Sequence, residues 1–97
     1  MSNASKHEFL KAKALNFRTL LQSYSPEPEV VSMLSGFNEI MLLPTIQTVL
    51  IPLKNANKLE ITADQVMSKL RVPDNEKTEV RTKILRYFAL FIEVAST

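Results

Sequence analysis

The chain has 97 residues, of which 45% are hydrophobic and 23% are charged, and it carries a formal net charge of +2. This length and composition predict a single folded domain over residues 1–97 and exclude a disordered chain. Because cysteine is absent, disulfides and thiolate metal sites are excluded, and stability must come from packing. No block of like charges occurs, which excludes a polybasic arm for nucleic acid or lipid.

Glycine occurs once, at Gly36, whereas proline occurs five times. Strand-rich domains of this size usually need several glycines for their hairpin turns. Prolines, together with serine, threonine and aspartate, instead mark the ends of helices. We therefore predict an all-α fold, a compact bundle of about five helices with an apolar C-terminal helix at its centre.

Residues 5–24 are predicted to form the first helix. Ser5 and Glu8 have the capping-box spacing, in which the two side chains satisfy free N–H groups at a helix start. Residues 1–4 are expected to be disordered. Lys13 falls within the apolar stripe of this helix, so it either extends to the rim of the core or faces a partner. At about 100° per residue, the stripe collects Phe9, Leu10, Phe17, Leu20, Leu21 and Tyr24.

The next elements are predicted from prolines and the single glycine. A second helix is expected over residues 27–43, with a break at Gly36. Pro44 then opens a third segment, residues 44–51, which Pro52 is expected to close. Its β-branched residues would also permit a strand. A helix is favoured because no partner strand is visible in the sequence.

Residues 30–53 carry a single charge, Glu39, and therefore raise the question of a membrane span. A span needs about 20 largely apolar residues, and Pro44 and Pro52 interrupt this stretch. Core helices are expected instead, and no membrane partner. Residues 6–18 are basic but no apolar segment follows them, so no signal peptide is expected. Together with the lack of cysteine, this predicts a cytoplasmic location.

The C-terminal part is predicted to hold two more helices. Thr62 and Gln65 form a second capping-box pattern, which would start a helix over residues 62–70. Pro73 interrupts the chain, and the last helix is expected over residues 75–95. The apolar residues of that helix cover about half of its circumference. They are Val80, Ile84, Leu85, Tyr87, Phe88, Phe91, Ile92 and Val94.

Catalytic chemistry has little support in this sequence. The single histidine, His7, has no second histidine or cysteine with which to form a zinc site or a nucleophile–base pair. One glycine cannot make a phosphate-binding loop. We expect no enzyme activity, no catalytic or metal-binding residue, no cofactor and no small-molecule substrate. The carboxylates Asp64, Asp74, Glu76 and Glu79 are interpreted as stabilising helix starts.

Residues 62–88 have the outline of a DNA-reading helix-turn-helix. The turn departs from that motif, because Arg71 stands where glycine is usual and the connection is about three residues too long. The second helix lacks a positive face, since Glu79 is placed to pair with Lys83 one turn later. A small DNA- or RNA-binding regulator is therefore the alternative hypothesis. Its contact residues would be Lys69, Arg71, Lys77 and Arg81, with Lys11 and Arg18 as further candidates.

The chain has more apolar surface than its small interior can hide. Residues 86–94 are too apolar for a helix on the surface of a bundle, and residues 40–53 are uncharged. Part of this surface is expected to be covered by another molecule. The predicted apolar partner site is Leu90, Phe91 and Val94. The predicted function is a non-enzymatic helical interaction module, accessory or regulatory, whose partner is another protein or a second copy of the chain.

Overall fold

The computed structural model describes residues 3–97, which fold into helices with no strand among them. The α-helices are α1 (Asn3–Gln22), α2 (Pro28–Leu34), α3 (Leu42–Thr45), α4 (Ile51–Asn55), α5 (Leu59–Ser68) and α6 (Lys77–Ala95). Two 3-10 turns, η1 (Ser35–Phe37) and η3 (Asp74–Glu76), and a π-helical turn, η2 (Ile46–Leu50), complete the elements. Because η1 extends α2 and η2 joins α3 to α4, there are five helical segments. The predicted all-α bundle of about five helices is confirmed.

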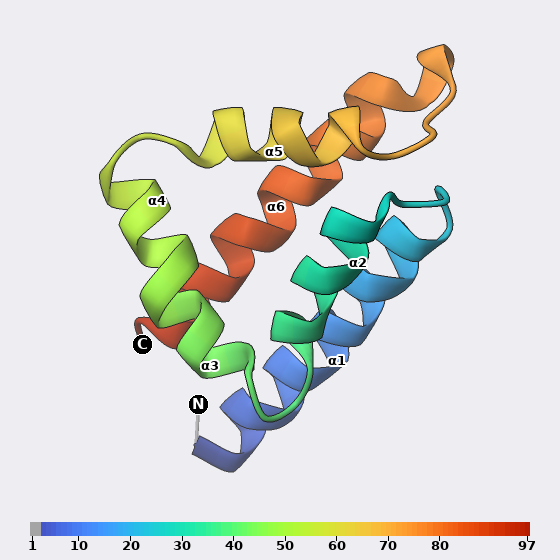
Figure 1. The fold of residues 1–97 in the computed structure, drawn as a ribbon. Helices are drawn as coiled ribbons and strands as arrows, with labels where there is room; N and C mark the ends of the chain where they lie inside the picture. Colours follow the sequence, from blue (N-terminus) through green and yellow to red (C-terminus); the bar gives the residue numbers. More distant parts are fainter. Residues whose placement is uncertain (1–2) are drawn as a thin grey trace.

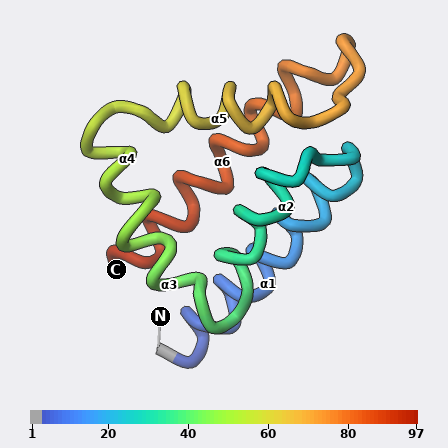
Figure 2. Tube along the Cα trace, in the orientation of Figure 1, coloured from blue at the N-terminus to red at the C-terminus, as the bar shows by residue number. Residues whose placement is uncertain are grey.

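Helix α6 runs through the middle of the bundle (Figure 1). Helix α1 lies alongside it, α5 crosses it near its start, and the α3–α4 segment packs near its end (Figure 2). The first turns of α1 and the C-terminal end of α6 lie together at one end of the molecule. There, Lys6 Nζ donates hydrogen bonds to the carbonyl oxygens of Ala95 (3.3 Å) and Thr97 (3.2 Å). The last helix is therefore held at the centre by the first.

The core is built around aromatic side chains from three elements. Phe17 of α1 is fully buried, and its ring centroid lies 4.9 Å from Phe37 and 5.9 Å from Phe88. Such tilted aromatic pairs add to the stability that burial alone supplies. Along α6, the buried positions follow the predicted helical spacing. They are Val80, Ile84, Phe88, Phe91 and Ile92.

Helix α1 begins earlier than its capping-box pattern indicates. The described part of the helix already includes Asn3, so Ser5 lies within it and does not cap it. Of residues 1–4, which were expected to be disordered, Asn3 and Ala4 form the first described residues of α1, and residues 1–2 lie outside the described part of the chain. The hydrogen bonds from Lys6 to the C-terminal end tie this first turn to α6. Tertiary contact thus extends the helix beyond its local signal.

The helix predicted over residues 27–43 changes to a 3-10 turn after Leu34, and this turn ends at Phe37, one residue after the expected break at Gly36. Beyond η1, the side chain of Asn38 replaces the helical pattern with local hydrogen bonds. Its Oδ1 accepts from the backbone N–H groups of Ile40 (2.9 Å) and Met41 (2.8 Å), and its Nδ2 donates to the Ser35 carbonyl (2.8 Å). Asparagine commonly makes such turns because its short side chain competes with the backbone ladder. The chain turns here and returns as α3.

The segment predicted over residues 44–51 is helical, so the strand alternative is wrong. Pro52 does not end it, because the chain continues as α4 to Asn55. A proline within a helix removes an N–H donor and clashes with the preceding turn. The π-helical turn before Pro52 accommodates the proline, since the Ile51 N–H donates to the carbonyl of Ile46, five residues back. The helix therefore continues beyond Pro52, because the turn before it is π-helical and wider than an α-helical turn.

No single helix in residues 3–97 is long and apolar enough to cross a membrane. Two neighbouring segments, Pro28–Phe37 and Leu42–Asn55, pass such a test only when taken together, and they are bent by 114° at their junction.

Helix α5 also starts earlier than expected, at Leu59. Thr62 lies inside its first turn, where its hydroxyl donates to the carbonyl of Lys58 (2.7 Å), and so the predicted capping box of Thr62 and Gln65 is wrong. The turn that follows is tied to the α1–α2 connection. Arg71 N–H donates to the Tyr24 carbonyl at 2.8 Å, next to a matching bond between residues 27 and 69 at 2.9 Å. These bonds fix how α5 and α6 are joined.

Candidate protein-interaction surfaces

The apolar partner site predicted at Leu90, Phe91 and Val94 is only partly at the surface. Phe91 is fully buried, because its ring packs 5.8 Å from Phe17 and 5.7 Å from Phe37. A side chain in the core cannot contact a partner, so the inclusion of Phe91 is wrong. Leu90 and Val94 are half-buried and remain accessible. Helical periodicity placed all three on α6 but could not show how far its neighbours cover it.

The predicted nucleic-acid contacts lie at the turn between α5 and α6. Three of the four pair with carboxylates: Lys69 with Glu29 (3.9 Å), Lys77 with Asp74 (2.9 Å) and Arg81 with Asp64 (2.7 Å). The hydrogen bond to Asp64 raises the pKa of Arg81 above its ordinary value. For Arg71, no ion pair occurs within residues 3–97. A surface for phosphates needs positive charge without counter-charges, and most of this cluster is neutralised internally.

The further basic candidates are also engaged within the molecule. Lys11 Nζ lies 3.4 Å from a carboxylate oxygen of Glu39. The guanidinium of Arg18 donates to the backbone carbonyl of Phe37. Both contacts join α1 to the segment around η1. Their first role in this structure is therefore to hold two elements together.

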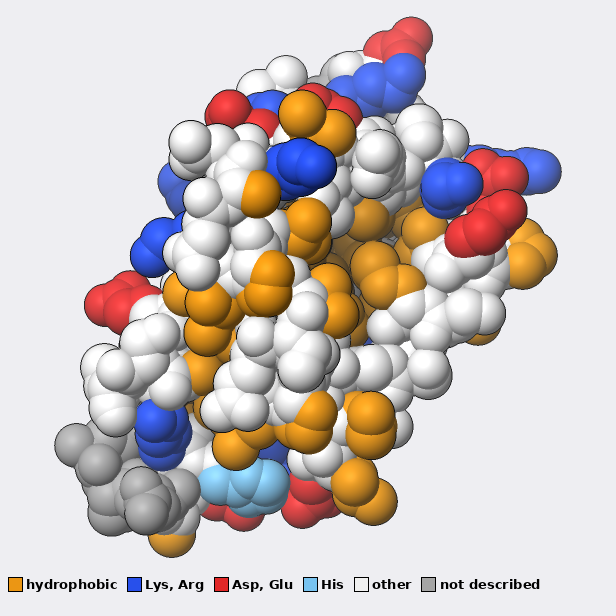
Figure 3. All heavy atoms as spheres, turned by 60° about the vertical axis from the view of Figure 1, so that its left-hand side comes forward, with side chains coloured by type: hydrophobic (Ala, Val, Ile, Leu, Met, Phe, Trp, Pro, Cys, Tyr) orange, Lys and Arg blue, Asp and Glu red, His pale blue; other side chains and the backbone are white. Residues whose placement is uncertain are grey.

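One stretch of the chain outside the predicted site carries several exposed apolar side chains. Ile40 is 84% exposed, the highest value among the large hydrophobic residues that the structure describes. The other exposed ones include Met41, Leu43 and Val49, all from the same uncharged stretch. We call these four residues the apolar face. Hydrophobic side chains gather along this part of the molecule and into a hollow beside it (Figure 3).

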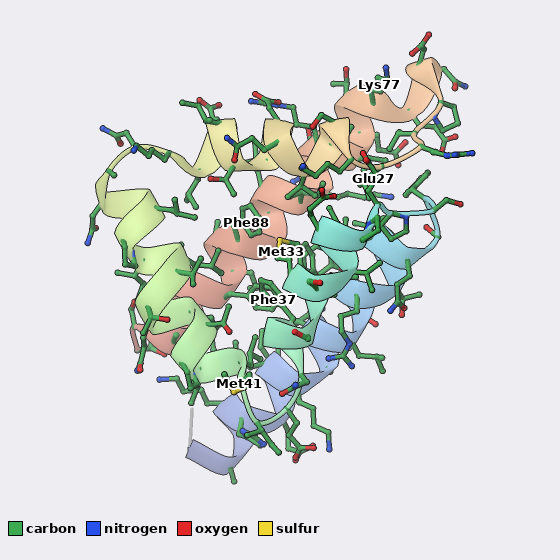
Figure 4. All side chains as sticks on the ribbon, in the orientation of Figure 1. Glu27, Met33, Phe37, Met41, Lys77 and Phe88 are labelled. Atoms are coloured by element: carbon green, nitrogen blue, oxygen red, sulfur yellow. The ribbon has the colours of Figure 1, made fainter. Side chains whose placement is uncertain are left out.

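The hollow is a groove between α2 and the α3–α4 segment, with a volume of about 270 Å³. Met33, Phe37 and Phe88 lie around it and come from three different elements (Figure 4). Val49 and Leu53 line the opposite wall. The remaining lining residues are small or polar and uncharged, apart from one more leucine: Ser32, Ser35, Gly36, Thr45, Leu50 and Thr62. The α2–α4 groove is therefore a depression without charge, open beside the apolar face.

Glu39 anchors the start of the apolar face to α1. Its carboxylate lies 3.5 Å from His7 Nε2 and 3.4 Å from Lys11 Nζ. The hydrogen bond from His7 and the charge of Lys11 lower the pKa of Glu39 below its ordinary value of 4.5. Ile40 follows directly, so these contacts hold the backbone next to the most exposed apolar side chain to α1.

The lowered pKa of Glu39 makes the anchor sensitive to acid. A carboxyl whose pKa is lower in the folded state stabilises that state above the unfolded pKa and loses the effect as pH falls through the folded pKa. The difference in the free energy of unfolding between wild type and Glu39→Gln should therefore be largest at neutral pH and vanish in strong acid. Thermal unfolding across this range measures it. NMR titration of the double variant His7→Ala/Lys11→Met should place the Glu39 pKa closer to 4.5, and an unchanged value would contradict the assigned cause.

The described residues show no further arrangement for chemistry. Within residues 3–97, no three histidine or acidic side chains gather closely enough to hold a metal ion. Among residues 4–97, no polar side-chain atom is buried without a hydrogen-bond partner. His7 is exposed and faces the Glu39 carboxylate. Its contact thus has a structural explanation, the anchoring of the turn.

Comparison with known proteins gives no family for this chain. No protein-family model matches it, and no curated protein or solved structure shows significant similarity. Function is therefore inferred from the side chains that the fold places on its surface.

Proposed function

We propose that this chain is a small non-enzymatic interaction module, accessory or regulatory, that acts by binding a protein through the apolar face and the α2–α4 groove. The observation that carries this proposal is the concentration of exposed apolar side chains on one uncharged segment. Ile40, Met41, Leu43 and Val49 are all exposed there. The bound protein is another chain or a second copy of this one.

The chemistry of the surface supports a protein as the ligand. The centres of protein interfaces lack charged residues and are enriched in methionine and aromatic side chains. The apolar face shares the lack of charge and includes Met41, and Glu39, its only charged neighbour along residues 38–49, is paired with α1. The adjoining groove supplies Met33, which is half-buried, and methionine adapts readily to the shape of a partner.

The groove also limits what part of a partner can enter. A volume of about 270 Å³ suits one or two large apolar side chains. Interface energy usually concentrates in a few anchor side chains that fill such pockets. We therefore expect a partner segment that inserts an aromatic or aliphatic side chain beside Val49, while its flanks cover Ile40 and Met41.

Placing charge on the apolar face should abolish this binding without unfolding the chain. We expect the double variant Ile40→Glu/Val49→Glu to lose at least about tenfold in affinity, because burying an unpaired carboxylate is costly. Sedimentation over a range of concentrations tests self-association. Affinity capture from the source cells, comparing wild type with the variant, tests other partners. Leu15→Glu is the matched control, since Leu15 is an exposed apolar residue of α1 outside this face.

Several results would contradict the proposal. A chain that stays monomeric and retains the same proteins with and without the two glutamates would not use this face. Salt-sensitive binding to a DNA duplex that is lost in Lys77→Glu/Arg81→Glu would favour the nucleic-acid alternative. Circular dichroism on each variant ensures that only folded protein is compared.

A further inference from the structure

A second groove lies between α1 and α6, on the other side of α6 from the α2–α4 groove. Its volume is about 340 Å³. Leu20, Tyr87 and Leu90 form its apolar floor. Three cationic side chains complete the lining: Lys13, Lys83 and Arg86. We call this depression the α1–α6 groove.

The charge of this groove is one-sided. Its six lining residues include three cations and no carboxylate. Lys83 is balanced by Glu79, at 3.1 Å, on the same helix. Lys13 has no ion pair within residues 3–97, and its Nζ lies 5.4 Å from the ring centroid of Phe9. Arg86 likewise has none among those residues. Two positive charges therefore border an apolar floor without counter-charges.

Two further carboxylates near the ends of α6 do not line this groove. Glu76 accepts a hydrogen bond from the Tyr24 hydroxyl at 3.0 Å, near the start of α6. Glu93 lines a different depression, together with Ile92 and Ser96. Lys13 and Arg86 therefore have no carboxylate partner within residues 3–97. At residues 69–81, by contrast, three of the four basic side chains pair with carboxylates.

We propose that the α1–α6 groove binds an acidic amphipathic segment of another protein, with apolar side chains on the floor and Asp or Glu against Lys13 and Arg86. An amphipathic helix in a groove between two helices is a recurrent form of peptide recognition. This arrangement would give a role to the half-buried Leu90 and to Lys13, the lysine within the apolar stripe of α1.

The geometry favours a peptide over other anionic ligands. A nucleic-acid backbone would satisfy the cations but would leave the leucine floor covered by polar groups. A membrane surface would meet the raised helices before the concave floor between them. A short acidic peptide with apolar residues on one face matches both the floor and the rim. This surface is separate from the apolar face, and so it does not rest on the function proposed above.

The test is a fluorescence-anisotropy titration with a labelled helical peptide of about 15 residues, carrying leucines on one face and glutamates beside them. We expect saturable binding that weakens about tenfold or more in Lys13→Glu/Arg86→Glu and at high salt, since each reversal turns attraction into repulsion. Leu90→Asp should weaken it similarly. Lys54→Glu/Lys58→Glu makes the same change in net charge away from the groove and should bind as wild type does. So should Ile40→Glu/Val49→Glu.

Several results would contradict peptide binding at the α1–α6 groove. Failure of the acidic peptide to saturate, or equal binding of a peptide with lysines in place of its glutamates, would overturn the proposal. So would equal losses in both charge-reversal pairs, which would indicate attraction to net charge alone. Binding of DNA or of anionic lipid vesicles in preference to the peptide, with loss in Lys13→Glu/Arg86→Glu, would assign the groove to that ligand and reject the peptide. Unchanged thermal unfolding verifies that each variant is folded.

Discussion

Replacing Phe17 with alanine should lower the free energy of unfolding by about 3–5 kcal/mol, the usual cost of removing a buried aromatic side chain. Phe17 is fully buried and touches rings from η1 and α6, with centroids 4.9 Å away at Phe37 and 5.8 Å away at Phe91. The substitution would remove contacts to both elements and leave a cavity where they meet.

A loss of this size is large for so small a domain. Folded domains have a total stability of about 5–15 kcal/mol, and each kcal/mol shifts the melting temperature of a chain this size by about 4–8 °C. Urea and thermal unfolding monitored by circular dichroism would measure the effect. Leu15→Ala is the control, because Leu15 is 54% exposed on the same helix and should change stability by no more than about 0.5 kcal/mol. Similar losses for the two variants would refute this assignment of the core.

Replacing Gly36 with valine should cost about 1–3 kcal/mol, because the added side chain has no room. A Cβ atom at this position would lie 2.9 Å from Thr45 Oγ1, below normal contact distance. Gly36 does not have a positive φ angle, so the close approach of η1 to α3, rather than backbone conformation, accounts for the glycine. The alanine variant should be destabilised less, since only one carbon atom must be accommodated.

Thr45 provides a direct test of this cause. In a Thr45→Ala background, the clashing hydroxyl is absent and the nearest remaining atom, the Cβ, would be 3.8 Å away. Gly36→Ala should there become neutral or stabilising, because alanine loses less backbone entropy than glycine by about 0.5–1 kcal/mol. A double-mutant cycle of unfolding free energies measures the coupling. If Gly36→Ala costs the same in both backgrounds, the contact with Thr45 is not its reason.

Gly36 and Thr45 also line the α2–α4 groove, so core packing and the proposed binding surface share residues. Phe88 shows the same double use, since it is almost fully buried and forms part of the groove. Variants meant to test binding must therefore avoid these positions. Ile40 and Val49 meet that requirement because they are exposed and their substitution leaves the core intact.

The last helix shows how much the local sequence can predict. The apolar spacing of α6 identified its buried residues, among them Val80, Ile84 and Phe88, and the opposite face was correctly predicted to pair Glu79 with Lys83, at 3.1 Å. These features depend on residues three or four positions apart on one helix, which is information that the sequence contains.

The helix starts show where such reasoning fails. The capping-box patterns at Ser5 and Thr62 satisfy the sequence rule, yet both residues lie inside helices that begin earlier. At Pro52, the helix was expected to end, but a π-helical turn lets it continue. The local preference that is overridden is about 1 kcal/mol for a helix cap and about 3 kcal/mol for a proline inside a helix.

By itself, the sequence determined that the chain is helical, that its last helix is largely apolar, and that residues 40–53 carry no charge. Only the tertiary structure decided which apolar side chains are covered: Phe91 lies in the core, whereas Ile40 is 84% exposed. It likewise decided that Arg81 pairs with Asp64, 17 residues away, while Lys13 and Leu90 meet at the α1–α6 groove. The physical reason is that periodicity assigns a side chain to a face of its own helix, and only the packing of other helices determines whether that face meets protein or solvent.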